Sequence, residues 1–246
     1  MADPRNHKGF QCGLALFALL LTQSAFGDNQ AQHNGVDKIY HPYVNALEKE
    51  FEYRVLYQND GIPAEDDILR HRIGYGQAVN DRVFLELNIL NINPPDGSSR
   101  LEAYELEARM QLTEQGEYWA DWGIVFELER QRSDAVTELA STLLIEKEFG
   151  SWTATANLTS EFEFGSDIDD ELDTELALQA RYRLSEHFEP AVEFYQDEFT
   201  SALGPVVQGL ERVGINRKLH WELGVLFPLN HTTPDTTYRF LLEYEF

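Results

Sequence analysis

The chain has 246 residues, is 43% hydrophobic and 12% aromatic, and carries 43 Asp and Glu against 19 Lys and Arg, a formal net charge of −24. This excess of acids excludes nucleic acid as a partner, because binding to phosphates needs clustered cations. Intrinsic disorder, the other common reason for a high net charge, disagrees with the aromatic content and with the alternating pattern described below.

Residues 1–27 have the pattern of a secretory signal peptide. A short basic start precedes an apolar run from Gly13 to Leu21, which is too short to span a bilayer. Ala25 to Gly27 offers the small-x-small pattern of a cleavage site, so we expect the mature chain to begin near Asp28. Without residues 1–27 the chain would carry 17 Lys and Arg against 42 Asp and Glu, a net charge of −25.

The only cysteine, Cys12, lies in this predicted signal peptide. The mature chain would therefore have no thiol, no disulfide and no thiolate metal site, which suits passage through an oxidising compartment. Residues 28–42 are polar and irregular, and we expect them to form a periplasmic lead-in to a barrel over residues 43–246. They include His33 and His41, but no third ligand stands near, so no metal site or cofactor is predicted, and the sequence leaves metal binding by these histidines open.

From residue 43 onward, apolar and polar residues alternate in twelve segments. A period of two indicates a β-strand whose faces lie in different media. No apolar run after residue 27 is long enough for a transmembrane helix, so a membrane-spanning chain of this kind must close into a barrel to satisfy its backbone. We place the segments at about 43–58, 68–79, 82–90, 101–112, 118–129, 135–149, 152–164, 171–183, 188–195, 206–214, 219–229 and 236–246; the parity of the tenth is unclear.

The connections support the same fold. Those after odd-numbered segments are longer and rich in loop residues, whereas those after even-numbered segments are mostly tight turns. This connectivity is typical of outer-membrane barrels, with both termini in the periplasm. The prediction is an all-β, closed, antiparallel transmembrane β-barrel of about 12 strands. A lipocalin-like soluble barrel would have the opposite polarity, with a wide apolar interior.

The last segment ends on an aromatic residue. One face of Thr236 to Phe246 carries Tyr238, Phe240, Leu242, Tyr244 and Phe246. This stretch resembles the C-terminal assembly signal of bacterial outer-membrane β-barrels. The resemblance implies a Gram-negative outer membrane, with its lipid, the barrel-assembly machinery and periplasmic chaperones as partners. The longer run from Gly204 to Phe246 is also similar to transporter-like barrels associated with aromatic-compound degradation, which implies the fold and no substrate.

The predicted inner faces carry a cluster of charges. The first, second and fourth segments contribute Glu48, Glu50, Glu52, Arg54, Arg70, Arg72, Glu105, Glu107 and Arg109. Acids and arginines at neighbouring positions are expected to form cross-strand ion pairs. Two interpretations stay open: a salt-bridged lining that fixes the strand register, or a selectivity constriction made of opposed charges.

Catalytic motifs are missing from the sequence. There is no Gly-x-Ser-x-Gly, Walker or dinucleotide-binding pattern. Phospholipase barrels use a lipid-facing Ser and His, but His71 and Ser141 lie on the second and sixth segments, beyond hydrogen-bonding reach at about 4.8 Å per strand. His231 and Asp235 share one loop, without the paired rim residues of a protease, and the sequence leaves metal binding by this histidine open.

The functional prediction follows from the lining. The assigned inner faces carry 22 acids and eight arginines, a surplus of 14 that a dry interior could not hold, since unpaired buried carboxylates are costly. Water should enter such a lumen, and its negative charge should concentrate cations. We therefore predict a monomeric, non-enzymatic pore for small cationic or uncharged polar solutes. A plugged structural or adhesive barrel and a lipid-facing enzyme are the alternatives.

Overall fold

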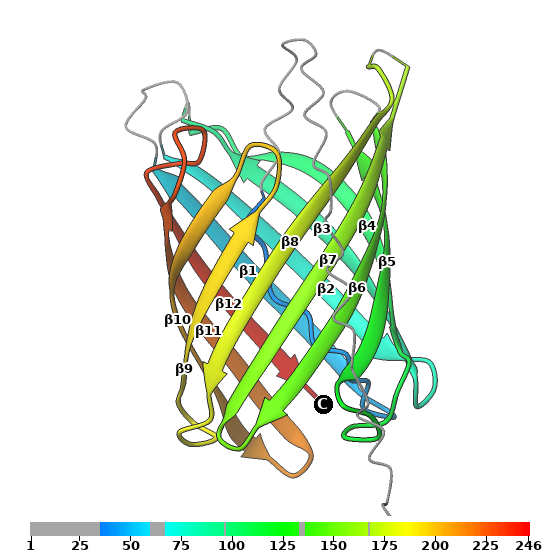
Figure 1. Ribbon diagram of the computed structural model, residues 1–246. Coiled ribbons are helices and arrows are strands. Elements are labelled where there is room, and N and C mark those ends of the chain that lie inside the picture. Colours follow the sequence, from blue (N-terminus) through cyan, green and yellow to red (C-terminus); the bar gives the residue numbers. More distant parts are fainter. Residues whose placement is uncertain (1–34, 60–66, 96, 133–135, 167) are drawn as a thin grey trace, which may run out of the picture. The chain divides into compact units, whose positions relative to one another are not determined.

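The computed structural model describes residues 35–59, 67–95, 97–132, 136–166 and 168–246 (Figure 1). The predicted signal peptide over residues 1–27, its cleavage site, and His33 lie outside the described residues. No helix in the described part of the chain is long and apolar enough to cross a membrane.

Within these residues the chain forms twelve antiparallel strands that close into a barrel in the order β1-β12-β11-β10-β9-β8-β7-β6-β5-β4-β3-β2 (Figure 1). Each strand pairs with its neighbours in sequence, and the barrel closes between the first and last strands, where Glu50 lies opposite Glu245. The predicted fold class is confirmed. The strands are β1 Lys49–Asn59, β2 Ile68–Ala78, β3 Val83–Asn93, β4 Arg100–Gln111, β5 Asp121–Gln131, β6 Thr137–Phe149, β7 Trp152–Phe164, β8 Glu171–Tyr182, β9 Glu189–Gln196, β10 Ser201–Gly214, β11 Arg217–Pro228 and β12 Thr236–Glu245.

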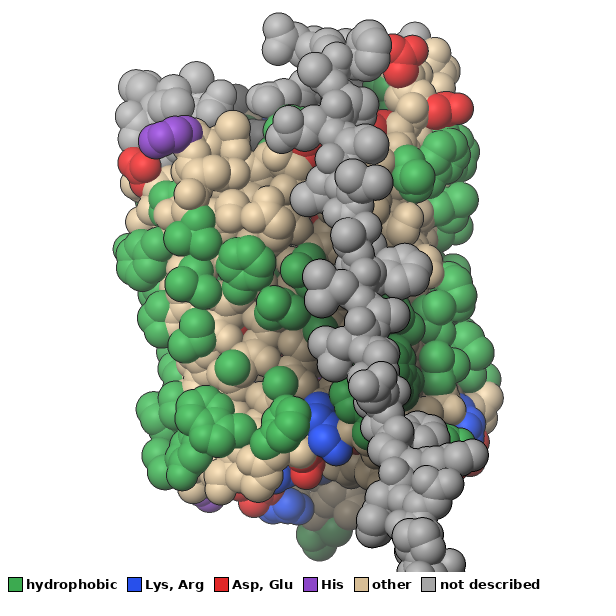
Figure 2. Space-filling view, viewed as in Figure 1, with side chains coloured by type: hydrophobic (Ala, Val, Ile, Leu, Met, Phe, Trp, Pro, Cys, Tyr) green, Lys and Arg blue, Asp and Glu red, His purple; other side chains and the backbone are tan. Residues whose placement is uncertain are grey.

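The alternation in the sequence separates the two faces of the wall. Large apolar side chains such as Leu87, which is 63% exposed, cover the outside, and Figure 2 shows them spread over the wall between the two rims. The inside carries carboxylates such as Glu193 and Glu107, which are 0% and 1% exposed. Apolar outside and polar inside is the polarity of a membrane barrel. It is the reverse of a lipocalin-like barrel.

The two ends of the barrel differ. We call the end where odd-numbered strands finish the loop end, and the end where even-numbered strands finish the turn end. The chain terminus lies at the turn end, where the Phe246 amide donates to the Lys49 carbonyl at 2.9 Å (Figure 1). Most connections at the turn end are short, but residues 112–120 between β4 and β5 and residues 183–188 between β8 and β9 are longer, and residues 197–200 at the loop end are short. The predicted alternation of connection lengths therefore has exceptions at both ends.

Two predicted strand starts are wrong by five residues or more. The tenth strand begins at Ser201, not near residue 206, and its inward face carries Ala202, Gly204 and Val206. Because these inward-facing residues are small or apolar, polar and apolar residues do not alternate in this part of the strand. The sequence therefore could not show which of its residues face inward. The first strand begins at Lys49 rather than residue 43, after a turn in which Leu47 has a φ of 69°.

Candidate functional site in the barrel lumen

A chain segment crosses the interior of the barrel. Residues 35–44, here called the inner segment, form no strand or helix. Val36 clusters with Leu56, Ala202 and Leu226 near the loop end. At the other extreme, Val44 packs on Ala78 and Phe84, near the turn end.

Ten residues in an extended chain reach about 33 Å, which matches the height of a membrane barrel. The inner segment therefore runs through the lumen from the loop end to the turn end, and then turns back into β1 (Figure 1).

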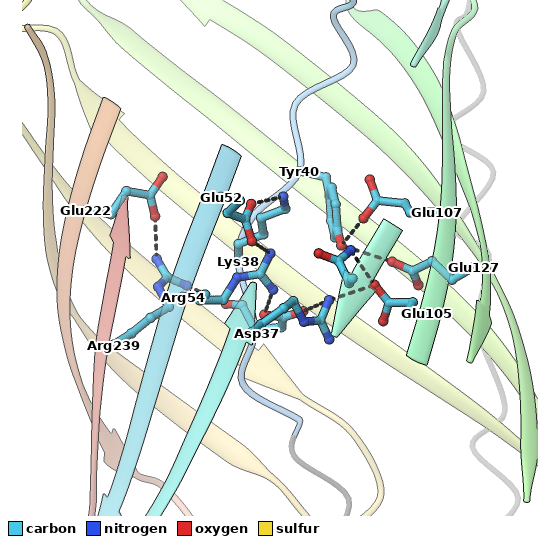
Figure 3. A network of polar contacts seen from close by, with 12 residues as sticks. Asp37, Lys38, Tyr40, Glu52, Arg54, Glu105, Glu107, Glu127, Glu222 and Arg239 are labelled. Atoms are coloured by element: carbon cyan, nitrogen blue, oxygen red, sulfur yellow. Dashed lines mark hydrogen bonds and ion pairs between the residues drawn. The ribbon is translucent and has the colours of Figure 1, made fainter. Parts of the chain in front are cut away.

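This placement corrects the prediction for the part of residues 28–42 that the structure describes. Residues 35–42 lie inside the barrel, not in a periplasmic lead-in. This position could not be predicted because the segment pairs with no single neighbouring strand, so no period of two appears in its sequence. Its partners are separate polar side chains on many strands, and those partners define the candidate site (Figure 3).

Asp37 binds the segment to an arginine group on the wall. Its carboxylate accepts a hydrogen bond from Arg54 and lies 3.6 Å from Arg72 Nη1. Its backbone carbonyl accepts hydrogen bonds from the Tyr195 hydroxyl, at 2.6 Å, and from Arg239. The Asp37 carboxylate thus meets two guanidinium groups of the wall, those of Arg54 and Arg72.

Lys38 inserts into a group of carboxylates. Its ammonium lies 2.5 Å from Glu52 and 4.0 Å from both Glu86 and Glu243. The same nitrogen stands 4.8 Å from the centre of the Tyr40 ring. The ammonium is thus buried among three carboxylates, and Glu52 accepts its hydrogen bond.

Tyr40 is held at both its backbone and its side chain. The Asn157 side chain accepts from the Tyr40 amide at 2.8 Å and donates to the Tyr40 carbonyl at 3.0 Å, as a neighbouring strand would. The Tyr40 hydroxyl lies 2.8 Å from Glu107 and 3.0 Å from Glu127, as the close-up in Figure 3 shows. Asn157 therefore supplies locally what β-pairing would supply to a strand.

The lower part of the segment is fixed near the turn end. His41 Nδ1 lies 2.5 Å from a Glu146 oxygen, and the Tyr43 hydroxyl donates to Asp121 at 2.8 Å. The Val44 amide donates to the Gln111 side chain at 2.9 Å. Both ends of the segment are thus tied to the wall, by side chains and not by a ladder of backbone hydrogen bonds.

The predicted charge cluster is only partly brought together. Arg54 pairs with Glu52 on its own strand at 2.6 Å, and Arg72 pairs with Glu105 at 3.0 Å. Both arginines also meet Asp37 of the inner segment, which the sequence did not place there. Among the residues that the structure describes, only Glu52 of the acids Glu48, Glu50 and Glu52 pairs with an arginine of the predicted cluster.

The remaining predicted members lie apart from this group. Arg70 reaches Glu102 on β4, at 3.3 Å, because a long side chain can pass over β3. Glu48 precedes β1 and accepts from the Asn45 amide at 3.1 Å. Arg109 stacks its guanidinium 4.9 Å from the centre of the Phe84 ring. Glu50 and Glu107 are buried on the inner wall, as expected from their parity.

A second arginine centre was not recognised as a site from the sequence. Arg239 lies 2.8 Å from Glu193 and 3.0 Å from Glu222, and is 2% exposed. The alternation in β12 correctly predicted that Arg239 faces inward. Nothing in the sequence indicated its contact with Glu193, which is 46 residues away. Lys38 was missed for the same reason, since it lies outside every alternating segment.

The residues considered for catalysis stay separate. His71 lies on the outer wall, where its Nδ1 is 2.8 Å from the Tyr53 hydroxyl. Ser141 is on β6 and faces Ser160 of β7 in the strand register. His231 and Asp235 lie in the connection between β11 and β12. Nothing in the described residues joins the first two into a nucleophile–base pair.

The aromatic end of the chain lies on the outer wall at the closing seam. Tyr238, Phe240, Leu242 and Tyr244 share the outward face of β12, and Phe246 stacks on Phe51 of β1 with ring centres 5.6 Å apart. The terminal residues thus join the first and last strands. Their reading by an assembly machinery stays a prediction.

No family model matches the sequence, and no curated protein sequence matches it. Solved structures do match the fold. The chain is similar to the KdgM porin in complex with disordered oligogalacturonate, with 14% identity and a TM-score of 0.55 over 80% of this chain and 99% of that one. An outer-membrane channel from Pseudomonas putida F1 matches with 12% identity and a TM-score of 0.54, over 85% of this chain and 98% of that one.

The translocator domain of the autotransporter NalP from Neisseria meningitidis matches with 9% identity and a TM-score of 0.51, over 82% of this chain and 89% of that one. At these identities the likeness shows the barrel fold alone.

Proposed function

We propose that the protein is a monomeric outer-membrane channel whose lumen is closed by the inner segment and opens when that segment is displaced. One observation carries the proposal: a polar, irregular segment occupies a polar lumen and is held there by side chains, not by a strand ladder. Such contacts can be exchanged one at a time for water or solute, whereas a paired strand could not leave without breaking the wall. Two of the similar folds are a porin and an outer-membrane channel, which supports transport as the role.

The open lumen would favour cations and uncharged polar solutes. Around the inner segment the wall presents more acids than cations: Glu50, Glu52, Glu86, Glu105, Glu107, Glu127, Glu193 and Glu222 stand against Arg54, Arg72, Arg109 and Arg239. Displacing the segment would remove one anion, Asp37, and one cation, Lys38, so the acidic surplus would remain. A surplus of fixed negative charge attracts cations and repels anions.

The rival proposal is a plugged structural or adhesive barrel without conductance. The ion pair of the buried Lys38 with Glu52, at 2.5 Å, and the clamp by Asn157 favour it, because both contacts hold the inner segment in the closed state. A lipid-facing enzyme has no comparable support. We propose that the protein has no enzymatic activity.

Planar-bilayer recording of the mature protein in a potassium chloride gradient tests the proposal. We expect rare openings whose reversal potential shows a preference for potassium, and more frequent openings when residues 35–44 are replaced by a Gly/Ser linker. Heat-modifiable gel mobility of both proteins would establish that the barrel is folded. A silent wild type beside a conducting linker variant would favour the plugged barrel, absence of conductance from both folded proteins would refute the channel, and a preference for chloride would refute the charge argument.

A further inference from the structure

The strongest unassigned feature of the lumen is the set of carboxylates around the Lys38 ammonium. Glu52 and Glu86 belong to the wall strands β1 and β3 and are each 1% exposed, and Glu243 comes from β12. Acids from the adjacent strands β12 and β1 and from β3, which lies beyond β2 along the wall, thus point to one place in the lumen. That point is occupied by an ammonium group from a part of the chain that is not a strand.

One of these acids is left incompletely satisfied by the lysine. Both side-chain oxygens of Glu86 are buried and accept no hydrogen bond from the described residues, and the closer one is 4.0 Å from Lys38 Nζ. A buried carboxylate without hydrogen bonds is costly. A lysine tethered to the backbone has a limited choice of position, so it contacts Glu52 at 2.5 Å and leaves Glu86 at a distance. A free ammonium group could settle between the two.

Gly74 of β2, the strand next to β3, leaves the space that the Glu86 carboxylate occupies. A Cβ at Gly74 would lie 2.1 Å from Glu86 Oε1, so the glycine leaves space for the carboxylate in its present position against β2. The position of this acid is therefore set by the wall strands.

We infer that Glu52, Glu86 and Glu243 form a binding site for a primary ammonium group, which Lys38 occupies in the closed state and which a solute carrying an alkylammonium group takes when the inner segment is displaced. This inference rests on the proposed channel function and names its solute class. The three N–H donors of a primary ammonium suit several carboxylates at once. Because solute and Lys38 compete for one site, binding of the solute also shifts the barrel toward its open state.

Calorimetric titration with n-propylammonium chloride tests the site without reference to conductance. Lys38→Ala keeps Cβ and removes the propylammonium part of the side chain, which leaves room for a probe of the same size. We expect Lys38→Ala to bind n-propylammonium at least tenfold more tightly than the wild type, and Lys38→Ala/Glu86→Gln to lose at least tenfold of that affinity. Tetramethylammonium, which has no N–H donors, should bind to neither. Lys38→Ser serves in the same way if Lys38→Ala lacks the heat-modifiable mobility of a folded barrel.

The matched control is Lys218→Ala. Lys218 lies 2.6 Å from Glu245 but is partly exposed and meets this one carboxylate, so its removal should create no propylammonium site. Equal binding by wild type, Lys38→Ala and Lys218→Ala would show general attraction to surface acids and would overturn the inference. So would no binding by folded Lys38→Ala. If the binding is found but no variant conducts, the channel proposal fails while the site stands.

Discussion

Replacing Asp37 by asparagine should loosen the inner segment without changing its shape. Asparagine keeps the side-chain volume but loses the charge that meets Arg54 and Arg72. Neither arginine is stranded, because Glu52 and Glu105 remain beside them at 2.6 and 3.0 Å. The loss is therefore the attraction between segment and wall, and not the burial of an unpaired cation.

The magnitude follows from the exposure of this carboxylate. A hydrogen bond to a charged group contributes about 1.5–3 kcal/mol when it is buried. The Asp37 side chain is 34% exposed, and solvent screening reduces the value to about 1–2 kcal/mol. At 1.36 kcal/mol per factor of ten, the open probability should rise roughly 5- to 30-fold.

Single-channel recording at fixed voltage measures this change directly. Asp81→Asn is the matched control, because it removes the same charge from the exposed connection between β2 and β3. We expect the open probability of Asp81→Asn to equal that of the wild type. An open probability of Asp37→Asn that matches the control would refute the role of this ion pair in closing the lumen.

Two further results are expected. Asn157→Leu leaves the Tyr40 amide and carbonyl without their partner at about 1–3 kcal/mol each, so it should raise the open probability at least tenfold while the mature barrel keeps its heat-modifiable mobility. Deletion of Phe246 removes its ring contact with Phe51 and the terminal aromatic of the assembly signal, so outer-membrane levels measured by fractionation should fall sharply while periplasmic export persists; normal insertion would contradict this reading.

Most of the wall could be predicted because its two faces meet different media. Along β11, for example, Trp221 and Leu223 face outward while Glu222 faces inward, and this contrast repeats along the chain. Where the contrast vanishes, the prediction weakens. The upper part of β10 was taken for a loop, because apolar Ala202 and Val206 stand where polar residues were expected. Val36 and Ile39 of the inner segment form an apolar cluster with Ala202, so the missing contrast has a physical cause.

The inner segment itself could not be predicted in this way. A repeat of polar and apolar residues indicates a regular element whose two faces lie in different media. The inner segment is irregular, and the barrel wall surrounds it on all sides. Its contacts join Asp37 to Arg239 and Tyr40 to Asn157, pairs that are 202 and 117 residues apart. The surplus of acids on the predicted inner faces could be counted from the sequence. Lys38, whose ammonium neutralises part of that charge, could not be placed because its stretch shows no alternation of polar and apolar residues.

A reversible lock on the inner segment tests its role as the gate most directly. A Cβ at position 35 would lie 2.7 Å from Asp197 Cγ, close to the roughly 3 Å between a Cβ and the partner sulfur of a disulfide. The predicted mature chain has no other cysteine, so Gly35→Cys/Asp197→Cys should form one bond that ties the segment to the wall. We expect the oxidised protein to lose its potassium conductance and to regain it after reduction, while the single variant Asp197→Cys conducts under both conditions. Equal conductance of the double variant before and after reduction, with the disulfide verified by mass spectrometry, would contradict the assignment of this segment as the gate.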